Sequence, residues 1–258
     1  MRQLLPEFGE TTPAERYTGL RLGDRAPADR PYVVSNFAET VDGQVTIQGR
    51  AGPIGTRTDM EILHLLRTQV DAVMIGAATM RAECYGRLVP DPGLRGLRER
   101  AEGLAHDPLA VIVTRTLDLP WECDLFSGGW GRVLIAAAGD EEIPDLATST
   151  RVVRFTDRVD LTELLRMLRA ERGVRSLLCE GGPHTHGQLV ELELIDELFV
   201  TVAPKLAGGS GPGLLEGALE QERPLEPVWL CEDGGELYSR YRVAVSYTHL
   251  TLPTTPYV

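Results

Sequence analysis

The sequence is poor in cysteine, and its cysteines are badly spaced for disulfide frameworks or zinc sites. Cys84, Cys123, Cys179 and Cys231 are the only four in 258 residues, and none forms a CxxC pair or stands at a metal-ligand spacing from a histidine. Disulfide scaffolds and structural zinc sites depend on such spacings. We therefore expect no disulfide framework, no metal site and a reducing compartment.

Basic charge is scarce as well, with 26 Lys and Arg against 38 Asp and Glu and a formal net charge of −12. A field of this sign repels polyanions, which argues against nucleic acid and anionic membranes as partners. Long apolar runs are also lacking, because none approaches the roughly 20 residues of a membrane span. The first residues are too acidic for a signal peptide, so the sequence predicts a cytoplasmic protein.

Several nucleotide-binding and hydrolase motifs are missing. The chain has no GxGxxG after its first strand, no GxxxxGK[ST] and no GxSxG. These absences argue against a Rossmann dinucleotide site, a P-loop and a serine nucleophile, respectively.

Short apolar runs alternate with amphipathic segments along most of the chain. This alternation predicts an α/β protein with three α-β-α layers around a mainly parallel sheet. The last two runs flank Gly234 and Gly235 and predict a C-terminal antiparallel hairpin. Thr58 is the expected N-cap of the first long helix. The expected strands are 31–39, 71–76, 109–114, 132–138, 151–155, 174–180, 196–204, 227–233 and 236–243, and the expected helices are 56–70, 77–84, 161–173 and 183–194.

Two strands run directly into glycine and then into a helix, at DAVMIGAATMRAE (71–83) and SLLCEGGPHTHGQLV (176–190). Ligands of open parallel sheets bind outside the carboxyl ends of the strands, and a helix N-terminus offers unpaired N–H groups to an anion. Gly181 and Gly182 would let a phosphate approach the backbone, and Pro183 suits a first helical turn. The two glycine turns together predict a dinucleotide site. The alternative is that the glycines serve tight packing alone.

Four stretches resemble the reductase domain of the bifunctional riboflavin-biosynthesis deaminase–reductase, which has a dihydrofolate-reductase-like fold. They are SNFAETVDGQVT (35–46), LRTQVDAVMIGAATMRAE (66–83), LLCEGGP (177–183) and LIDELFVTVAPKLAGG (194–209), in family order. The resemblance implies NADPH as hydride donor, reduction at C1′ of a 5-amino-6-(ribosylamino)uracil 5′-phosphate type of substrate, and a homodimer. The HxE…PCxxC zinc motif of the deaminase half is absent, so the chain resembles the stand-alone reductases. Some of these reduce dihydrofolate, which keeps a pteridine reductase as an alternative.

The resemblance also implies a set of cofactor-binding residues around the two glycine turns. Thr114 and Arg115 follow a strand and are expected to meet the 2′-phosphate of NADPH, because a guanidinium donates paired hydrogen bonds to phosphate. The alternative for Arg115 is a solvated surface charge. His184 and His186 lack an evident third ligand, so we expect no metal. The full set is Ala38, Gly76, Thr79, Glu83, Thr114, Arg115, Gly181, Gly182, Pro183, His184 and Gly187.

Glu180 is the catalytic candidate, expected to touch the substrate or to help protonate its imine nitrogen. Its alternative is an N-cap for the following helix, although capping favours shorter side chains. Arg67 is expected at the substrate phosphate, with a helix-end salt bridge as the alternative. Asp42 is expected either to bind substrate or to fix the turn before Gly43, and Arg87 is a further phosphate candidate.

The chain is expected to contain one catalytic domain with two appended ends. Residues 1–30, rich in Pro, Arg and Glu, are predicted to be an extended N-terminal arm, and 31–245 the reductase domain. Residues 246–258 carry no Lys, Arg, Asp or Glu and show no periodicity, which predicts a non-native tail. A third function also stays open: a nucleotide-binding protein that keeps the phosphate site at the glycine turns and has lost catalysis.

Overall fold

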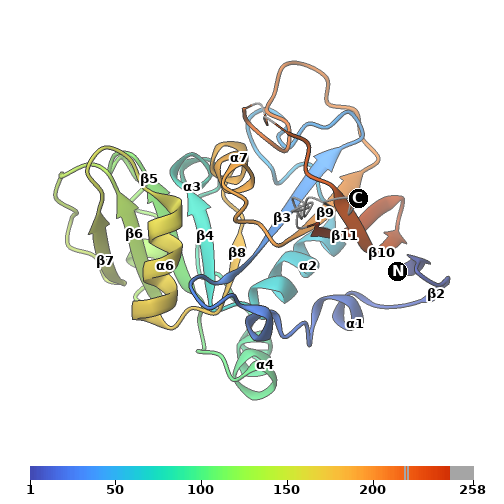
Figure 1. Ribbon diagram of the computed structural model, residues 1–258, viewed down its shortest axis with the longest axis horizontal. Coiled ribbons are helices and arrows are strands. Elements are labelled where there is room, and N and C mark those ends of the chain that lie inside the picture. Colours follow the sequence, from blue (N-terminus) through green and yellow to red (C-terminus); the bar gives the residue numbers. More distant parts are fainter. Residues whose placement is uncertain (218, 220, 245–258) are drawn as a thin grey trace, which may run out of the picture.

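Strands and helices alternate along most of the chain (Figure 1), and the computed structural model describes residues 1–217, 219 and 221–244. The predicted tail at 246–258 lies outside the described residues. The strands are β1 (Arg2–Leu5), β2 (Gly9–Glu10), β3 (Tyr32–Thr40), β4 (Ala72–Gly76), β5 (Leu109–Thr114), β6 (Arg132–Ala137), β7 (Ser149–Arg154), β8 (Ser176–Cys179), β9 (Glu197–Ala203), β10 (Leu225–Asp233) and β11 (Glu236–Val243). The helices are α1 (Pro13–Tyr17), α2 (Arg57–Arg67), α3 (Ala77–Glu83), α4 (Pro92–Glu102), α5 (Asp124–Ser127), α6 (Leu161–Arg172) and α7 (Pro183–Glu191), with a 3₁₀ helix η1 (Leu22–Arg25).

The described strands form one 11-stranded sheet in the order β2-β1-β10-β11-β9-β3-β8-β4-β5-β6-β7. Every pair from β9 to β7 is parallel. Every pair from β2 to β9 is antiparallel. Figure 1 shows the parallel half with β7, β6, β5 and β4 side by side, and the antiparallel half at the other end of the molecule. The mainly parallel sheet and its C-terminal hairpin are both confirmed.

Helices cover both faces of the parallel half. On one face, Leu164 of α6 and Leu189 of α7 belong to a buried cluster that includes Met74 of β4. On the other face, Leu66 of α2 belongs to a second cluster that includes Val73 of the same strand. Successive residues of a strand point to opposite faces, so a strand buried on both sides reads as a continuous apolar run. The predicted three-layer α-β-α arrangement is therefore confirmed.

The first 30 residues fold onto the sheet, which corrects the expectation of an extended arm. Strand β1 pairs with β10, and Tyr17 of α1 is buried in the same cluster as Leu66 of α2. A capping box begins α1, because Glu15 N donates to Thr12 Oγ1 at 3.2 Å and Thr12 N donates to Glu15 Oε2 at 2.9 Å. The polar composition concealed the few apolar residues that dock this segment.

Helices α2 and α4 differ from the prediction. The N-cap of α2 lies two residues earlier than expected, at Thr56 and not Thr58, and Thr58 N donates to Thr56 Oγ1 at 3.3 Å. Helix α4 was not predicted, although Asp91 caps it and Gly103 ends it in a left-handed conformation. Its sequence is rich in arginine and glycine, and only Leu94, Leu97 and Ala101 mark its apolar face.

A disulfide joins Cys84 to Cys123, which corrects the expectation drawn from cysteine spacing. The two cysteines are 39 residues apart, so no short motif could reveal the pair. Cys84 ends α3 and Cys123 immediately precedes α5, so the fold brings them together. Cys179 and Cys231 are free and buried.

Neither a metal-binding cluster nor a membrane-spanning helix is found among the described residues. No cluster of three or more His, Cys, Asp or Glu side chains there could hold a metal ion. No helix of that part of the chain has the length and apolar character needed to cross a membrane.

Candidate active site

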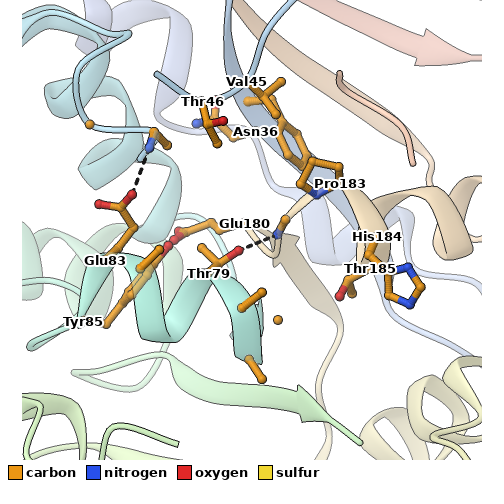
Figure 2. Close-up of a pocket in the computed structure, with 18 of the residues that line it drawn as sticks. Asn36, Val45, Thr46, Thr79, Glu83, Tyr85, Glu180, Pro183, His184 and Thr185 are labelled. Atoms are coloured by element: carbon orange, nitrogen blue, oxygen red, sulfur yellow. Dashed lines mark hydrogen bonds between the residues drawn. The ribbon is translucent and has the colours of Figure 1, made fainter. Parts of the chain in front are cut away.

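A cavity of about 810 Å³ opens toward the carboxyl ends of β3, β4, β5 and β8. This is where open α/β sheets bind their ligands. The structure brings most of the predicted site residues to its wall and leaves three of them outside: Asp42, Gly181 and Gly187. Those that line the cavity are Ala38, Arg67, Gly76, Thr79, Glu83, Arg87, Thr114, Arg115, Glu180, Gly182, Pro183 and His184, and Figure 2 shows part of this set.

The two glycine turns contact each other inside the cavity. Gly182 N donates to Thr79 Oγ1 at 2.8 Å, which joins the start of α7 to α3 (Figure 2). A Cβ at Gly182 would lie 2.9 Å from Thr79 Oγ1, and a Cβ at Gly76 would lie 2.9 Å from Thr185 Oγ1. Either side chain would fill the narrow gap between the turns. The gap therefore depends on glycine at both positions.

The first turn of α7 fits an anionic group. Helix α7 begins at Pro183, and its N-cap Gly182 makes no side-chain cap bond. His184 and Thr185 of that turn line the cavity. The first N–H groups of a helix have no intrahelical partner and carry a partial positive charge. Because the turn is glycine-bordered and uncapped, the residues present suit the phosphates of a dinucleotide.

Gly181 and Gly187 serve packing. A Cβ at Gly181 would lie 2.5 Å from Gly76 N, so the end of β8 can approach the end of β4 only without a side chain. A Cβ at Gly187 would lie 2.4 Å from the Glu216 carbonyl oxygen. Close packing therefore explains these two glycines, whereas Gly76 and Gly182 keep open the gap between the two turns.

Glu180 forms a buried ion pair with Arg67 in the cavity wall. Arg67 Nε and Nη2 donate to the two carboxylate oxygens at 2.7 Å each, and Nη1 donates to the Leu88 carbonyl at 2.9 Å. Glu180 does not cap α7, because Gly182 occupies that position. Arg67 is the last residue of α2, so the structure shows the salt-bridge alternative, and its guanidinium is engaged by Glu180.

The Tyr85 ring lies beside the guanidinium of this ion pair. Its centroid lies 5.4 Å from the Arg67 guanidinium carbon. Burial alone lowers the pKa of Arg67, but the charge and hydrogen bonds of Glu180 outweigh it and leave the pKa raised. Burial, followed by the charge of Glu180, raises the pKa of the Tyr85 hydroxyl. Arg67 therefore keeps its charge and Tyr85 keeps its proton near neutral pH.

Asp59 is an acidic residue of the cavity that the sequence analysis did not single out. It lines the cavity from the first turn of α2. Burial raises the pKa of its carboxyl group above the ordinary 3.8, and the charge of Glu236 adds to this shift. Its Oδ1 is buried without a hydrogen-bond partner among the described residues. An aspartate in a first helical turn is ordinarily a response to the helix dipole, so the sequence held no signal that set it apart.

Two of the predicted substrate-binding residues are held by other parts of the protein. Asp42 accepts hydrogen bonds from Thr40 Oγ1 at 2.6 Å and from the backbone nitrogens of Ala207 and Gly208 at 3.1 and 2.7 Å. These bonds, with Thr40 first, lower the pKa of Asp42 to about 2. Asp42 therefore has the turn-fixing role of its two alternatives.

Arg87 lines the cavity, but its guanidinium is taken by a carboxylate. Nε and Nη2 donate to the two oxygens of Asp107 at 2.8 and 2.7 Å. This hydrogen-bonded carboxylate raises the pKa of Arg87. A bidentate pair of this kind occupies the edge of the guanidinium that a phosphate would use.

Of the remaining predicted polar residues, Glu83 and Thr114 are hydrogen-bonded within the protein and Arg115 has no ion-pair partner among the described residues. Glu83 accepts from Ala51 N at 2.9 Å, which ties the loop after β3 to α3 (Figure 2). The Thr114 hydroxyl donates to the carbonyl of Thr116. Arg115 lines the cavity without an ion-pair partner in the part of the chain that the structure describes. Arg115 is therefore open to an anionic ligand.

The two histidines of α7 do not converge. His184 is exposed, with Nδ1 3.6 Å from Glu216 Oε2. His186 is buried, its Nδ1 lies 3.1 Å from the Leu214 carbonyl, and burial lowers its pKa to about 4. Their different surroundings agree with the interpretation that the His-x-His pattern is not a ligand pair.

Comparison with known proteins identifies the family. Residues 31–237 match the RibD C-terminal domain. The chain belongs to this family. It is 30% identical to the 2,5-diamino-6-ribosylamino-4(3H)-pyrimidinone 5′-phosphate reductase of Archaeoglobus fulgidus, over 73% of this chain and 87% of that protein. It is 29% identical to the riboflavin biosynthesis protein RibD of Bacillus amyloliquefaciens, over 72% of this chain and 49% of RibD.

Solved structures related to the RibD C-terminal family have the same fold. A pyrimidine reductase-like protein from Corynebacterium diphtheriae gives a TM-score of 0.74 at 23% identity, covering 91% of this chain and 100% of that one. RibD from Acinetobacter baumannii gives a TM-score of 0.69 at 21% identity, covering 84% of this chain and 59% of that one. These superpositions confirm the predicted fold class.

Proposed function

We propose that this protein is an NADPH-dependent reductase that transfers a hydride to C1′ of a pyrimidine ribosylamine 5′-phosphate in riboflavin biosynthesis. The observation that carries the proposal is a single cavity that combines the glycine-bordered start of α7 with the buried carboxyl group of Asp59. Membership of the RibD C-terminal family supports it, since curated relatives are named pyrimidinone phosphate reductases.

The cofactor would be held by residues at two ends of the cavity. Gly182, His184 and Thr185 at the start of α7 would bind its pyrophosphate, and Arg115 would bind its 2′-phosphate. When bound, the reduced nicotinamide supplies the hydride. The apolar and glycine-rich walls would position the ring and exclude water.

Asp59 and Glu180 would have different roles toward the substrate. Glu180 is held as a carboxylate by Arg67, so it would accept hydrogen bonds and would not donate a proton. Asp59 retains a proton more strongly than an ordinary aspartate because it is buried. It would therefore be the group that donates to a substrate nitrogen, a role that the sequence had suggested for Glu180.

Consumption of NADPH with defined substrates tests the proposal. We expect absorbance loss with a 5-amino-6-(ribosylamino)uracil 5′-phosphate or with its 2,5-diamino-pyrimidinone counterpart, and none with dihydrofolate. Turnover of dihydrofolate alone would favour the pteridine reductase. Calorimetric binding of NADPH without turnover of any substrate would favour a nucleotide-binding protein, and no binding would contradict the proposal. The homodimer and the cytoplasmic location stay predictions.

A further inference from the structure

A second buried carboxyl group lies behind Asp59. Glu236 begins β11, is 1% exposed and does not belong to the cavity wall, whereas Asp59 does. The Asp59 side chain lies against Gly55, the residue before the N-cap of α2. A Cβ at Gly55 would lie 2.2 Å from Asp59 Oδ2. Thr56, the N-cap of α2, donates from Oγ1 to Glu236 Oε2 at 2.5 Å. Both acids therefore lie at the start of α2, Asp59 in the cavity wall and Glu236 on the side of the sheet.

The strands place two hydroxyl donors around this pair. Tyr238 lies two residues after Glu236, so both side chains face α2, and its hydroxyl donates to the same Oε2 that Thr56 contacts. Tyr238 is in register with Thr201 of β9, whose hydroxyl bonds to Asp59. Glu236 thus has two hydroxyl donors on one oxygen and Asp59 has one.

The other two oxygens of the pair are unbonded. Asp59 Oδ1 and Glu236 Oε1 are both buried and have no hydrogen-bond partner among the described residues. Two neighbouring carboxyl groups with buried oxygens resist carrying two negative charges, which favours retention of one proton between them. Hydroxyl donors stabilise an ionised carboxyl group, and Glu236 has two of them on one oxygen.

Further titratable groups lie around the start of α2. Tyr17 of α1 and Tyr238 of β11 have raised pKa values, chiefly through burial, and stay neutral. Asp233 of β10 accepts from Thr58 Oγ1 at 2.9 Å and adds negative charge. Lys205 is a nearby cation, and its ammonium donates to the carbonyls of Pro53 and Ile54 at 2.8 and 2.7 Å.

We propose that Glu236 is a positioning residue that keeps the shared proton of a carboxyl pair on Asp59, so that the cavity presents a neutral Asp59 O–H to its ligand. Glu236 itself touches no ligand and acts through Asp59. The identity of that ligand rests on the proposed function, but the state of the proton does not.

The test is a carbon-13 NMR titration of the Asp59 carboxyl group in protein labelled at aspartate, with the resonance assigned by its loss in Asp59→Asn. In the wild type we expect a midpoint above that of an ordinary aspartate. In Glu236→Gln, which keeps the shape and removes the charge, the midpoint should fall by about one pH unit or more. In Tyr238→Phe it should fall in the same direction by less, because the anion on Glu236 loses one donor.

Glu226→Gln is the matched control, since Glu226 is exposed on β10, and its midpoint should equal that of the wild type. An ordinary midpoint in the wild type, or no change in Glu236→Gln with a native circular dichroism spectrum, overturns the proposal. If Glu236→Gln does not fold, Tyr238→Phe decides by the same criterion.

A pH profile of kcat/KM separates this proposal from the proposed function. If both hold, the alkaline limb of the profile should move to lower pH in Glu236→Gln by the same amount as the NMR midpoint. The NMR shift without turnover of any pyrimidine would leave the carboxyl pair established and the proposed function wrong. Turnover with an unshifted midpoint would do the opposite.

Discussion

Glu180 and Asp59 are carboxyl groups in the wall of one cavity, the first buried and the second half-buried, and the groups beside them are of opposite charge. Glu180 meets Arg67, which donates to both of its oxygens at 2.7 Å. Burial raises the pKa of Asp59, and the charge of Glu236 adds to this shift. The two carboxyl groups therefore differ in the sign of the charge beside them. An adjacent cation favours the charged form of a carboxyl group, whereas burial and an adjacent acid disfavour it.

The largest effect on this comparison is expected from Arg67→Met, which gives Glu180 an environment more like that of Asp59. Removing one member of a buried pair leaves the other charge uncompensated, at a cost of about 3–5 kcal/mol in the free energy of unfolding. Urea denaturation at neutral pH measures the loss. The double variant Arg67→Met/Glu180→Gln should recover much of it. Equal instability of the single and double variants would show that lost packing, and not the uncompensated charge, is responsible.

A smaller effect is expected from Gly181→Ala, which tests how rigidly Glu180 is positioned. The new Cβ would lie 2.5 Å from Gly76 N, so the ends of β8 and β4 must separate. Overpacking of this kind costs about 1–3 kcal/mol, measured as a lower urea midpoint. Gly9→Ala is the control, because a Cβ there meets nothing within 4 Å. Equal stability of the two variants would contradict the close approach of the strands.

The smallest effect is expected from Asp59→Asn, and it appears in the pH dependence of stability. Burial raises the pKa of Asp59 in the folded protein above its ordinary 3.8. The stability that this group contributes is therefore complete below 3.8 and is lost as pH rises through the folded pKa. Asparagine removes this loss.

The stability of Asp59→Asn relative to the wild type should therefore increase from about pH 4 to pH 7 in a series of urea denaturations. Asp157→Asn, at an exposed position after β7, should show a constant difference over the same range. A constant difference for Asp59→Asn as well would mean that the two carboxyl groups of the cavity do not differ in this way.

The sequence predicted the elements that depend on local pattern. The buried strands β4, β5 and β6 were found to within a residue, because strands covered on both faces are continuous apolar runs. Gly76 and Gly182 were placed in the cavity for a reason that the structure supports, since glycine after a strand and before a helix leaves room for a ligand. Helix α4 and the first 30 residues were missed because their polar composition hides the residues that pack.

The candidate site was predicted in its residues more than in their roles. Twelve of the fifteen predicted site residues line the cavity and three do not, and the exceptions are explained by backbone packing and by a turn. Arg67 and Glu180 are 113 residues apart, so no spacing rule could show that they bond to each other and not to the ligand. The same is true of the disulfide between Cys84 and Cys123.

The amino-acid sequence by itself determined the sheet, the glycine turns at its carboxyl edge and the family, because these depend on hydrophobic period, chain flexibility and short motifs. Only the tertiary structure decided which acid pairs with a cation and which acid has a raised pKa. That outcome depends on burial and on partners from distant strands and helices. Glu236 contacts the start of α2 at Thr56, and its charge raises the pKa of Asp59 because a charge acts through space without regard to its distance along the chain.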